Sequence, residues 1–382
     1  MSSGINFNIH EPFYKQVEND IKSKIINGVL KPGDLIHSHK ELAKYYGVSL
    51  ITIKKALYDL IKEGYLFSRV GKGTYVATFT AQRNNKTQTK NIGVVLRDLK
   101  HPYFASILTF IEQRINELGF HLILASSNDN NQDEEKQINR LLKMGVDGII
   151  IASLSLQYRA TTNIKKLHED KFPYVMISYI HEPEFWYVGS DHEYGGYIAT
   201  EHFIKFGYKK IGYVHAGYGN LLADIRKNGY ARALMEYNIP YKEDYIFYVE
   251  GELFLKLLND RYQQGLVLGN KIAELKDRPE ALFIYSDLLA LGIENALLEK
   301  GLKVPDDIAL IGFDGIEASA YAPVPLTTVK QQIEKIGTTV VDVLHKRING
   351  EDVSNRIIFK PFLLIRDSCG VKKNISSKIV NQ

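Results

Sequence analysis

Residues 38–57 read SHKELAKYYGVSLITIKKAL, and this stretch predicts two short helices separated by a tight turn. Ser38 and Glu41 have the spacing of a capping box, in which each side chain satisfies a free backbone N–H group of the other residue. Gly47 marks the turn, and Ser49 is a candidate cap for the second helix. A turn of this length containing glycine is typical of a helix-turn-helix unit, whose second helix enters the major groove of DNA.

The residues on either side of this stretch complete a small domain. A first helix is expected over residues 13–27, because apolar residues recur there at every fourth position. The second helix of the motif is expected to extend over residues 49–63, and its first residues, Leu50 and Ile51 among them, would lie nearest the bases. Residues 65–77 read as two short β segments around a Gly-Lys-Gly turn.

Basic residues are concentrated towards the N-terminal end of the chain. Residues 1–80 hold 11 Lys and Arg against 7 Asp and Glu, residues 81–90 add three basic residues and no acidic one, and residues 91–382 hold 34 basic and 37 acidic residues. This distribution favours a polyanion as partner of the N-terminal part, although an ordinary scatter of surface lysines would also produce it. The polar composition of residues 81–90, AQRNNKTQTK, is typical of a linker.

From Asn91 onward, buried strands alternate with helices. Continuous apolar runs separated by helices are typical of parallel sheets covered on both faces, and about eight strands over this length favour two lobes rather than one. Helices are expected at 104–118 and 134–144. The predicted strands are 92–96, 121–126, 146–153, 174–178, 210–216, 281–286 and 308–313.

Residues that directly follow these strands are candidates for a binding cleft, because ligands of open α/β sheets bind at the carboxyl ends of the strands. Aromatic faces among them can cover the C–H side of a sugar ring, and charged groups can bond its hydroxyls. For any single aromatic residue, core packing would be an equally good explanation. The candidates are His101 to Phe104, Ser126 to Asn128, Ala152 and Ser153, Ser178 and Tyr179, Ser286 and Asp287, and Asp314, with Arg226 near the start of a later helix.

These segments resemble two known families. Residues 12–77, which begin PFYKQVENDIKSKIINGVLKPGDLIHSHKEL, resemble the GntR-type winged helix-turn-helix. Motifs such as IGVVLRDLKHPYF, LLKMGVDGIIIAS, DIRKNGYARAL and VPDDIALIGFDG, spread over roughly residues 91–367, resemble the LacI/GalR and periplasmic sugar-binding family. A GntR-type DNA-binding domain joined to a LacI-type sensor domain resembles the arrangement of the bacterial arabinose repressors.

The resemblance implies a fold for each part. Residues 1–80 would form an α+β winged helix-turn-helix DNA-binding domain, and residues 81–90 a polar linker. Residues 91–382 would form an α/β, two-lobed, Rossmann-like domain of the periplasmic-binding-protein type I class, with three crossovers between the lobes and the effector in the cleft. This domain would also carry the dimerisation surface.

Two sets of site residues are expected from the helix-start positions and the resemblance together. Leu50 stands where the first family usually has an arginine that reads a guanine. The operator should therefore differ from the common family site at the base that this arginine would read. Ser178 and Tyr179 replace a frequent acidic pair of the second family, which leaves the identity of the sugar open. The DNA-binding set is Ser38, Lys40, Ser49, Leu50, Thr52, Lys54, Lys55, Gly71 and Lys72, and the effector-binding set is Tyr103, Phe104, Arg226, Ser286, Asp314 and Gln331.

The expected function is a homodimeric DNA-binding transcriptional repressor of carbohydrate-utilisation genes. It would bind a near-palindromic double-stranded operator and be released from it by a small molecule, most simply a monosaccharide. A solute-binding protein of a sugar transport system, an activator, and a regulator with a non-sugar effector are the alternatives.

No catalytic residue, metal site or cofactor is expected. Carboxylates such as Asp287 and Asp314 could be acid–base groups, but they serve ligand binding equally well, and the sequence has no P-loop, HExxH, GxSxG or dinucleotide GxGxxG motif. The single cysteine, Cys369, and the absence of a signal-peptide core and of any run approaching ~18 apolar residues favour a cytoplasmic protein without a membrane span.

Overall fold

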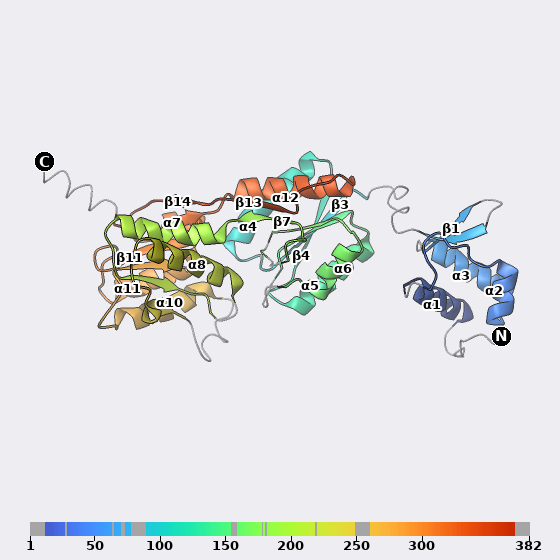
Figure 1. Cartoon of the computed structure of the whole chain (residues 1–382), viewed down its shortest axis with the longest axis horizontal. Coiled ribbons are helices and arrows are strands. Elements are labelled where there is room, and N and C mark those ends of the chain that lie inside the picture. Colours follow the sequence, from blue (N-terminus) through green and yellow to red (C-terminus); the bar gives the residue numbers. More distant parts are fainter. Residues whose placement is uncertain are drawn as a thin grey trace. The chain divides into compact units, whose positions relative to one another are not determined.

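The chain forms two compact units, residues 1–89 and 90–382 (Figure 1). Most of the expected linker and the predicted positions Gly71, Lys72 and Ser178 lie outside the residues that the structure describes. The structure is a computed structural model that describes residues 12–26, 29–62, 65–69, 73–77, 89–153, 159–177, 179, 182–217, 220–248 and 260–370.

The first unit has the predicted helix-turn-helix and hairpin. The capping box forms, with the Ser38 hydroxyl accepting from the Glu41 N–H at 3.3 Å and the Glu41 carboxylate accepting from the Ser38 N–H at 2.8 Å. The turn closes at Gly47, which is left-handed. The elements are α1 (Phe13–Ile26), α2 (His39–Tyr46), α3 (Leu50–Lys62) and the antiparallel pair β1 (Leu66–Arg69) and β2 (Gly73–Val76), around a core that includes Val17, Ile21, Ile53, Leu57, Leu60 and Val76.

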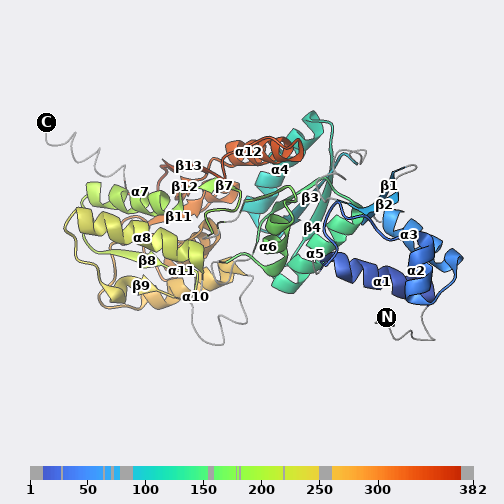
Figure 2. The same ribbon diagram turned by 45° about the vertical axis from the view of Figure 1, so that its right-hand side comes forward.

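The second unit contains two lobes, each built on a six-stranded sheet. In the first lobe the strand order is β13-β7-β6-β5-β3-β4, and the neighbouring strands all pair in parallel within the described residues. The helices α4 and α12 pack side by side on one face, as Figure 1 and Figure 2 show, and α5 and α6 cover the other. The elements are β3 (Asn91–Leu96), α4 (Pro102–Glu117), β4 (His121–Ser126), α5 (Asn131–Met144), β5 (Gly148–Ile151), α6 (Thr162–Glu169), β6 (Tyr174–Met176), β7 (Tyr187–Ser190), α12 (Ile333–Ile348) and β13 (Arg356–Phe359).

The second lobe repeats this layered plan with the strand order β14-β12-β11-β10-β8-β9. Helices α7 and α8 cover one face of its sheet, and α10 and α11 cover the other. The elements are α7 (His192–Lys205), β8 (Ile211–Val214), α8 (Leu221–Glu236), η1 (Glu243–Tyr245), β9 (Ile246–Phe247), α10 (Arg261–Ala273), β10 (Ala281–Ile284), α11 (Asp287–Glu299), β11 (Ala309–Asp314), η2 (Glu317–Ala320), β12 (Thr327–Lys330) and β14 (Phe362–Leu364).

The described chain passes between the lobes three times, after β7, after β12 and after β13, which confirms the expected crossovers. Several expectations about single elements were wrong. The strands β7, β9, β12, β13 and β14 were not predicted, and β14 runs antiparallel to β12 in an otherwise parallel sheet. Helices α4 and α5 begin two and three residues before the predicted starts, because Pro102 occupies the first turn of α4 and Asn130 caps α5.

Among the described residues, no helix is both long enough and apolar enough to cross a membrane.

Candidate effector cavity and nucleic-acid interface

A cavity of about 100 Å³ opens in the second unit where the carboxyl ends of the two sheets meet. This volume holds several water molecules or a small solute. Both lobes supply its walls, and nearly all the lining residues follow directly on a strand or begin the next helix. The lining residues are Arg97, Asp98, His101, Tyr103, Phe104, Asp129, Ile177 and Tyr179 from the first lobe, and His192, Leu222, Arg226, Arg261, Tyr285, Asp314 and Gln331 from the second lobe or its edge.

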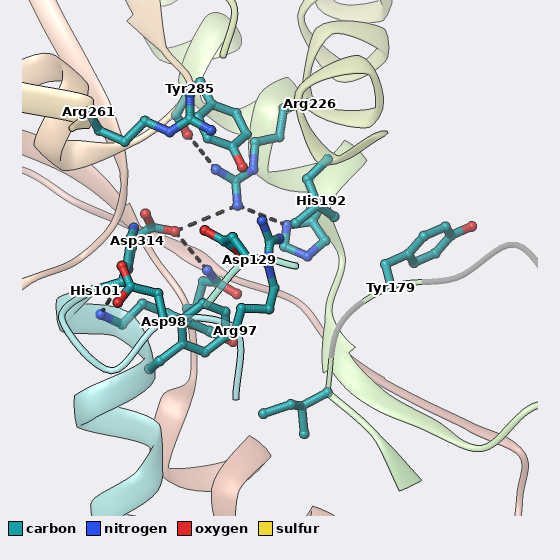
Figure 3. A pocket seen from close by; sticks show the side chains of 15 residues that line it. Arg97, Asp98, His101, Asp129, Tyr179, His192, Arg226, Arg261, Tyr285 and Asp314 are labelled. Atoms are coloured by element: carbon teal, nitrogen blue, oxygen red, sulfur yellow. Dashed lines mark hydrogen bonds and ion pairs between the residues drawn. The ribbon is translucent and has the colours of Figure 1, made fainter. Parts of the chain in front are cut away.

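Arg226, on the second turn of α8, lies at the centre of the cavity wall (Figure 3). Its guanidinium donates to the Tyr285 carbonyl oxygen, lies 3.6 Å from the Asp314 carboxylate and 3.3 Å from the His192 ring, and stacks 3.5 Å from the centroid of the Phe313 ring. Its Nε is buried without a hydrogen-bond partner among the described residues. A buried guanidinium that keeps an unpartnered N–H group can donate to a ligand oxygen.

Asp314 ends β11 with a φ of +119°, a conformation that costs a non-glycine residue free energy. The turn that follows is held by Asp287, whose carboxylate accepts from the Ile316 N–H at 2.9 Å and from the Thr328 hydroxyl at 2.6 Å. The Gln331 amide donates to Asp314 at 2.9 Å. Strained residues that the surrounding structure holds in place cluster at binding sites, and Asp314 is therefore a strong candidate ligand contact.

Burial determines the protonation of the two histidines in the wall. Burial lowers the pKa of His101, although Asp314 partly offsets this effect. Burial and then the neighbouring Arg226 lower the pKa of His192 well below its ordinary value. Both imidazoles are therefore neutral near pH 7, and each can donate or accept a hydrogen bond.

The positive and negative charges of the side chains that line the cavity balance. Three arginines and three aspartates line the cavity, so their formal charges cancel. Arg97 pairs with Asp129 at 2.8 Å, whereas Arg261 donates to the Ala216 carbonyl oxygen at 2.9 Å and has no carboxylate partner within the described part of the chain. A balanced wall rich in fixed hydrogen-bond groups suits an uncharged polyhydroxylated ligand better than a phosphate.

The structure brings five of the six expected effector residues to this one cavity: Tyr103, Phe104, Arg226, Asp314 and Gln331. Ser286 is not among the lining residues. It precedes α11 and is buried, and its hydroxyl has no partner among the described residues. His202 lies in α7 with its Nε2 3.3 Å from the Cys369 sulfur.

Four charged lining residues were missed. Arg97 and Asp98 follow β3 directly, and Asp129 comes three residues after β4, so the strand-end rule would have found them if it had been applied to every polar residue. Arg261 had no such signal, because the strand nearest before it, β9, is only two residues long. Tyr285, which follows β10, was also overlooked.

Asp287 provides a test of the buried hydrogen bonds that hold the turn after β11. Burial first, and Asp314 second, raise the pKa of Asp287 from 3.8 to about 8. Between these values the folded state keeps a proton that the unfolded state has released, so the free energy of unfolding falls as pH rises, by up to about 1.4 kcal/mol per pH unit. We expect Asp287→Asn to flatten this decline between pH 5 and 8, measured by urea denaturation. The exposed control Glu317→Gln should keep the wild-type slope, and an equally steep slope in Asp287→Asn would contradict the assignment.

The described members of the predicted DNA-binding set lie just before or within the first two turns of α2 and α3. Lys40, Ser49, Lys54 and Lys55 are exposed, and Lys54 has no ion pair within the described part of the chain. Lys55 pairs with Asp59 at 3.0 Å. These positions are consistent with phosphate and base contacts from two adjacent helix starts. The remaining described members of the set are Ser38, Leu50 and Thr52.

Two family models match the chain in separate segments. Residues 13–76 match the bacterial regulatory proteins of the gntR family, and residues 200–369 match the periplasmic binding protein-like domain.

Relatives match nearly the whole chain. An arabinose metabolism transcriptional repressor of Geobacillus stearothermophilus is 30% identical over 94% of this chain and 97% of its own length. An HTH-type transcriptional repressor PurR of Mannheimia succiniciproducens is 30% identical over 87% of this chain and 98% of its own. The crystal structure of a LacI family transcriptional regulator from Enterococcus faecium, with bound ribose, matches with a TM-score of 0.63 and 26% identity, over 73% of this chain and 98% of that one.

Proposed function

The chain belongs to the GntR-type bacterial regulators that carry a LacI/GalR-like sensor domain, and from this premise we propose that it is a transcriptional repressor of carbohydrate-utilisation genes that a small sugar releases from DNA. The observation that carries the proposal is the cavity between the two lobes, with Arg226 and Asp314 at its centre. No catalytic role is proposed for the carboxylates of the wall.

An uncharged monosaccharide is the effector that fits the wall best. The formal charges of the wall cancel, the histidines are neutral, and the aromatic rings of Tyr103, Phe104 and Tyr285 provide surfaces for C–H groups. Arginine and aspartate beside them provide donors and acceptors for hydroxyls. The ribose bound to the Enterococcus faecium regulator supports this class of ligand.

Release from DNA is expected because residues of both lobes line the cavity. A ligand that bonds residues of both lobes favours the closed arrangement, and closure changes the spacing or order of the DNA-binding units. The effector can change DNA affinity only by its differential affinity for the two states, which is typically ~1–3 kcal/mol. We propose that the protein acts as a cytoplasmic homodimer on a near-palindromic operator, because two identical recognition helices read two related half-sites.

A thermal-shift screen of the purified full-length protein tests the effector class. The ligands are pentoses, hexoses, their phosphates and purines. A ligand at 100 times its dissociation constant stabilises the protein by ~2.7 kcal/mol, which is a readable shift. We expect one uncharged sugar to raise the melting temperature of the wild type and of Glu317→Gln, but not of Asp314→Ala.

The outcomes of this screen separate the candidate effectors. A shift with a sugar phosphate alone would contradict the argument from charge balance. A shift with a purine alone would overturn the sugar proposal. A shift that persists in Asp314→Ala would place the ligand elsewhere.

A further inference from the structure

The start of α3 exposes two large aliphatic side chains next to each other. Leu50 is 43% exposed and Ile51 is 79% exposed, and both lie in the first turn of the helix. The buried face of the same helix is formed by Ile53, Ala56, Leu57 and Leu60. Leu50 and Ile51 are therefore not needed for the core, and they form an apolar patch that a partner can cover.

The two hydroxyl groups beside this patch and the nearby Lys55 are already engaged. The Ser49 hydroxyl accepts from the Thr52 N–H at 3.1 Å and shares a hydrogen bond with the Thr52 hydroxyl at 2.8 Å. Lys55 pairs with Asp59 at 3.0 Å. The surface that remains free at the first turn of α3 is therefore mainly aliphatic.

We propose that Leu50 and Ile51 contact the 5-methyl groups of thymines in the major groove, so that each operator half-site contains at least one thymine recognised through its methyl group. The first residues of the second helix of a helix-turn-helix lie nearest the bases. Thymine alone presents a methyl group in the major groove, and apolar side chains recognise it by contact. Lys54, exposed one turn after Leu50, supplies positive charge for a neighbouring phosphate.

This inference rests on the proposed function, because it specifies what the repressor reads. It is tested on the full-length protein with a DNA duplex selected by that protein from a randomised pool. Each thymine of the duplex is replaced in turn by deoxyuridine, which removes the methyl group and leaves every hydrogen-bonding group in place. At one thymine or more in each half-site, we expect the affinity measured by fluorescence anisotropy to fall about fourfold, as burial of one methyl-sized group predicts.

Alanine variants test whether Leu50 and Ile51 cause the loss of affinity on replacement of thymine by deoxyuridine. In Leu50→Ala or Ile51→Ala, the ratio of the affinities for thymine and deoxyuridine should fall to about one at the thymine that the replaced side chain contacts. Val29→Ala is the matched control, because Val29 is an aliphatic residue of the same unit, 69% exposed and outside α3. It should keep the wild-type ratio.

Two results would overturn the inference. One is a wild-type protein for which every thymine can be replaced without loss of affinity. The other is a thymine preference that survives unchanged in both alanine variants. If the protein enriches no duplex at all, the proposed repressor function fails together with the inference, whereas an enriched duplex without methyl dependence contradicts the inference alone.

Discussion

Replacing Arg226 with alanine is expected to weaken sugar binding by about 10-fold or more while the protein continues to bind its operator. Arg226 donates to the Tyr285 carbonyl oxygen, lies 3.6 Å from Asp314 and has a buried Nε without a partner among the described residues. Loss of a hydrogen bond from a charged donor to an uncharged ligand typically costs about 1.5–3 kcal/mol of binding free energy. Isothermal titration with the sugar from the thermal-shift screen measures the loss, and an operator-binding assay shows that the DNA-binding unit is intact.

Arg232→Ala is the control for this prediction, because Arg232 lies on the same helix but is partly exposed and pairs with Glu193 at 3.1 Å and Glu236 at 3.6 Å. Exposed ion pairs contribute little, so its sugar affinity should stay within about twofold of the wild type. Wild-type sugar affinity in Arg226→Ala would show that the cavity at Arg226 is not the effector site.

Replacing Gly229 with alanine is expected to lower the free energy of unfolding of the second unit by about 3 kcal/mol or more. Overpacking typically costs about 1–3 kcal/mol, and a substitution that forces the backbone to move lies at or above the upper end of this range. A Cβ at Gly229 would lie 1.9 Å from the Glu193 carbonyl oxygen and 2.7 Å from the Tyr197 N, so α7 and α8 would have to separate. For a unit of this size the melting temperature should fall by roughly 6–12 °C. Since α8 also carries Arg226, the affinity for sugar should fall as well.

The exposed Asn228, next to Gly229 on the same helix, provides the matched variant. Asn228→Ala should leave the melting temperature almost unchanged, because surface substitutions usually change stability by less than about 0.5 kcal/mol. A Gly229→Ala protein that melts with the wild type would mean that α7 and α8 are not in the close contact described here.

The first unit was predictable because its signals are local. The capping box at Ser38 and the glycine turn at Gly47 are each decided within a few residues, and both formed as expected. The sheet edges were not predictable in this way. β13 pairs with β7 although about 170 residues separate them in the chain, and strands of three or four residues carry too little periodicity to be recognised alone.

The cavity was partly predictable by the same logic. Residues at the carboxyl ends of strands could be identified from the sequence, and Asp314 reached the cavity as that rule implies, whereas Gln331 was expected only from the family resemblance. The strain at Asp314 and its support from Asp287 depend on backbone angles and on a contact with Thr328, which is 41 residues away in the chain. Such features become visible only once the sheet is assembled.

The central claim is that a sugar in the cavity controls DNA binding, and one measurement tests it most directly. Full-length protein is bound to its selected fluorescent duplex at fixed salt, and the sugar from the thermal-shift screen is added. We predict a rise in the dissociation constant for DNA of about 5–150-fold in the wild type, as a coupling of ~1–3 kcal/mol requires, and a smaller rise in Arg226→Ala at the same sugar concentration. A protein that binds both the duplex and the sugar, but whose affinity for DNA the sugar leaves unchanged, would contradict the account.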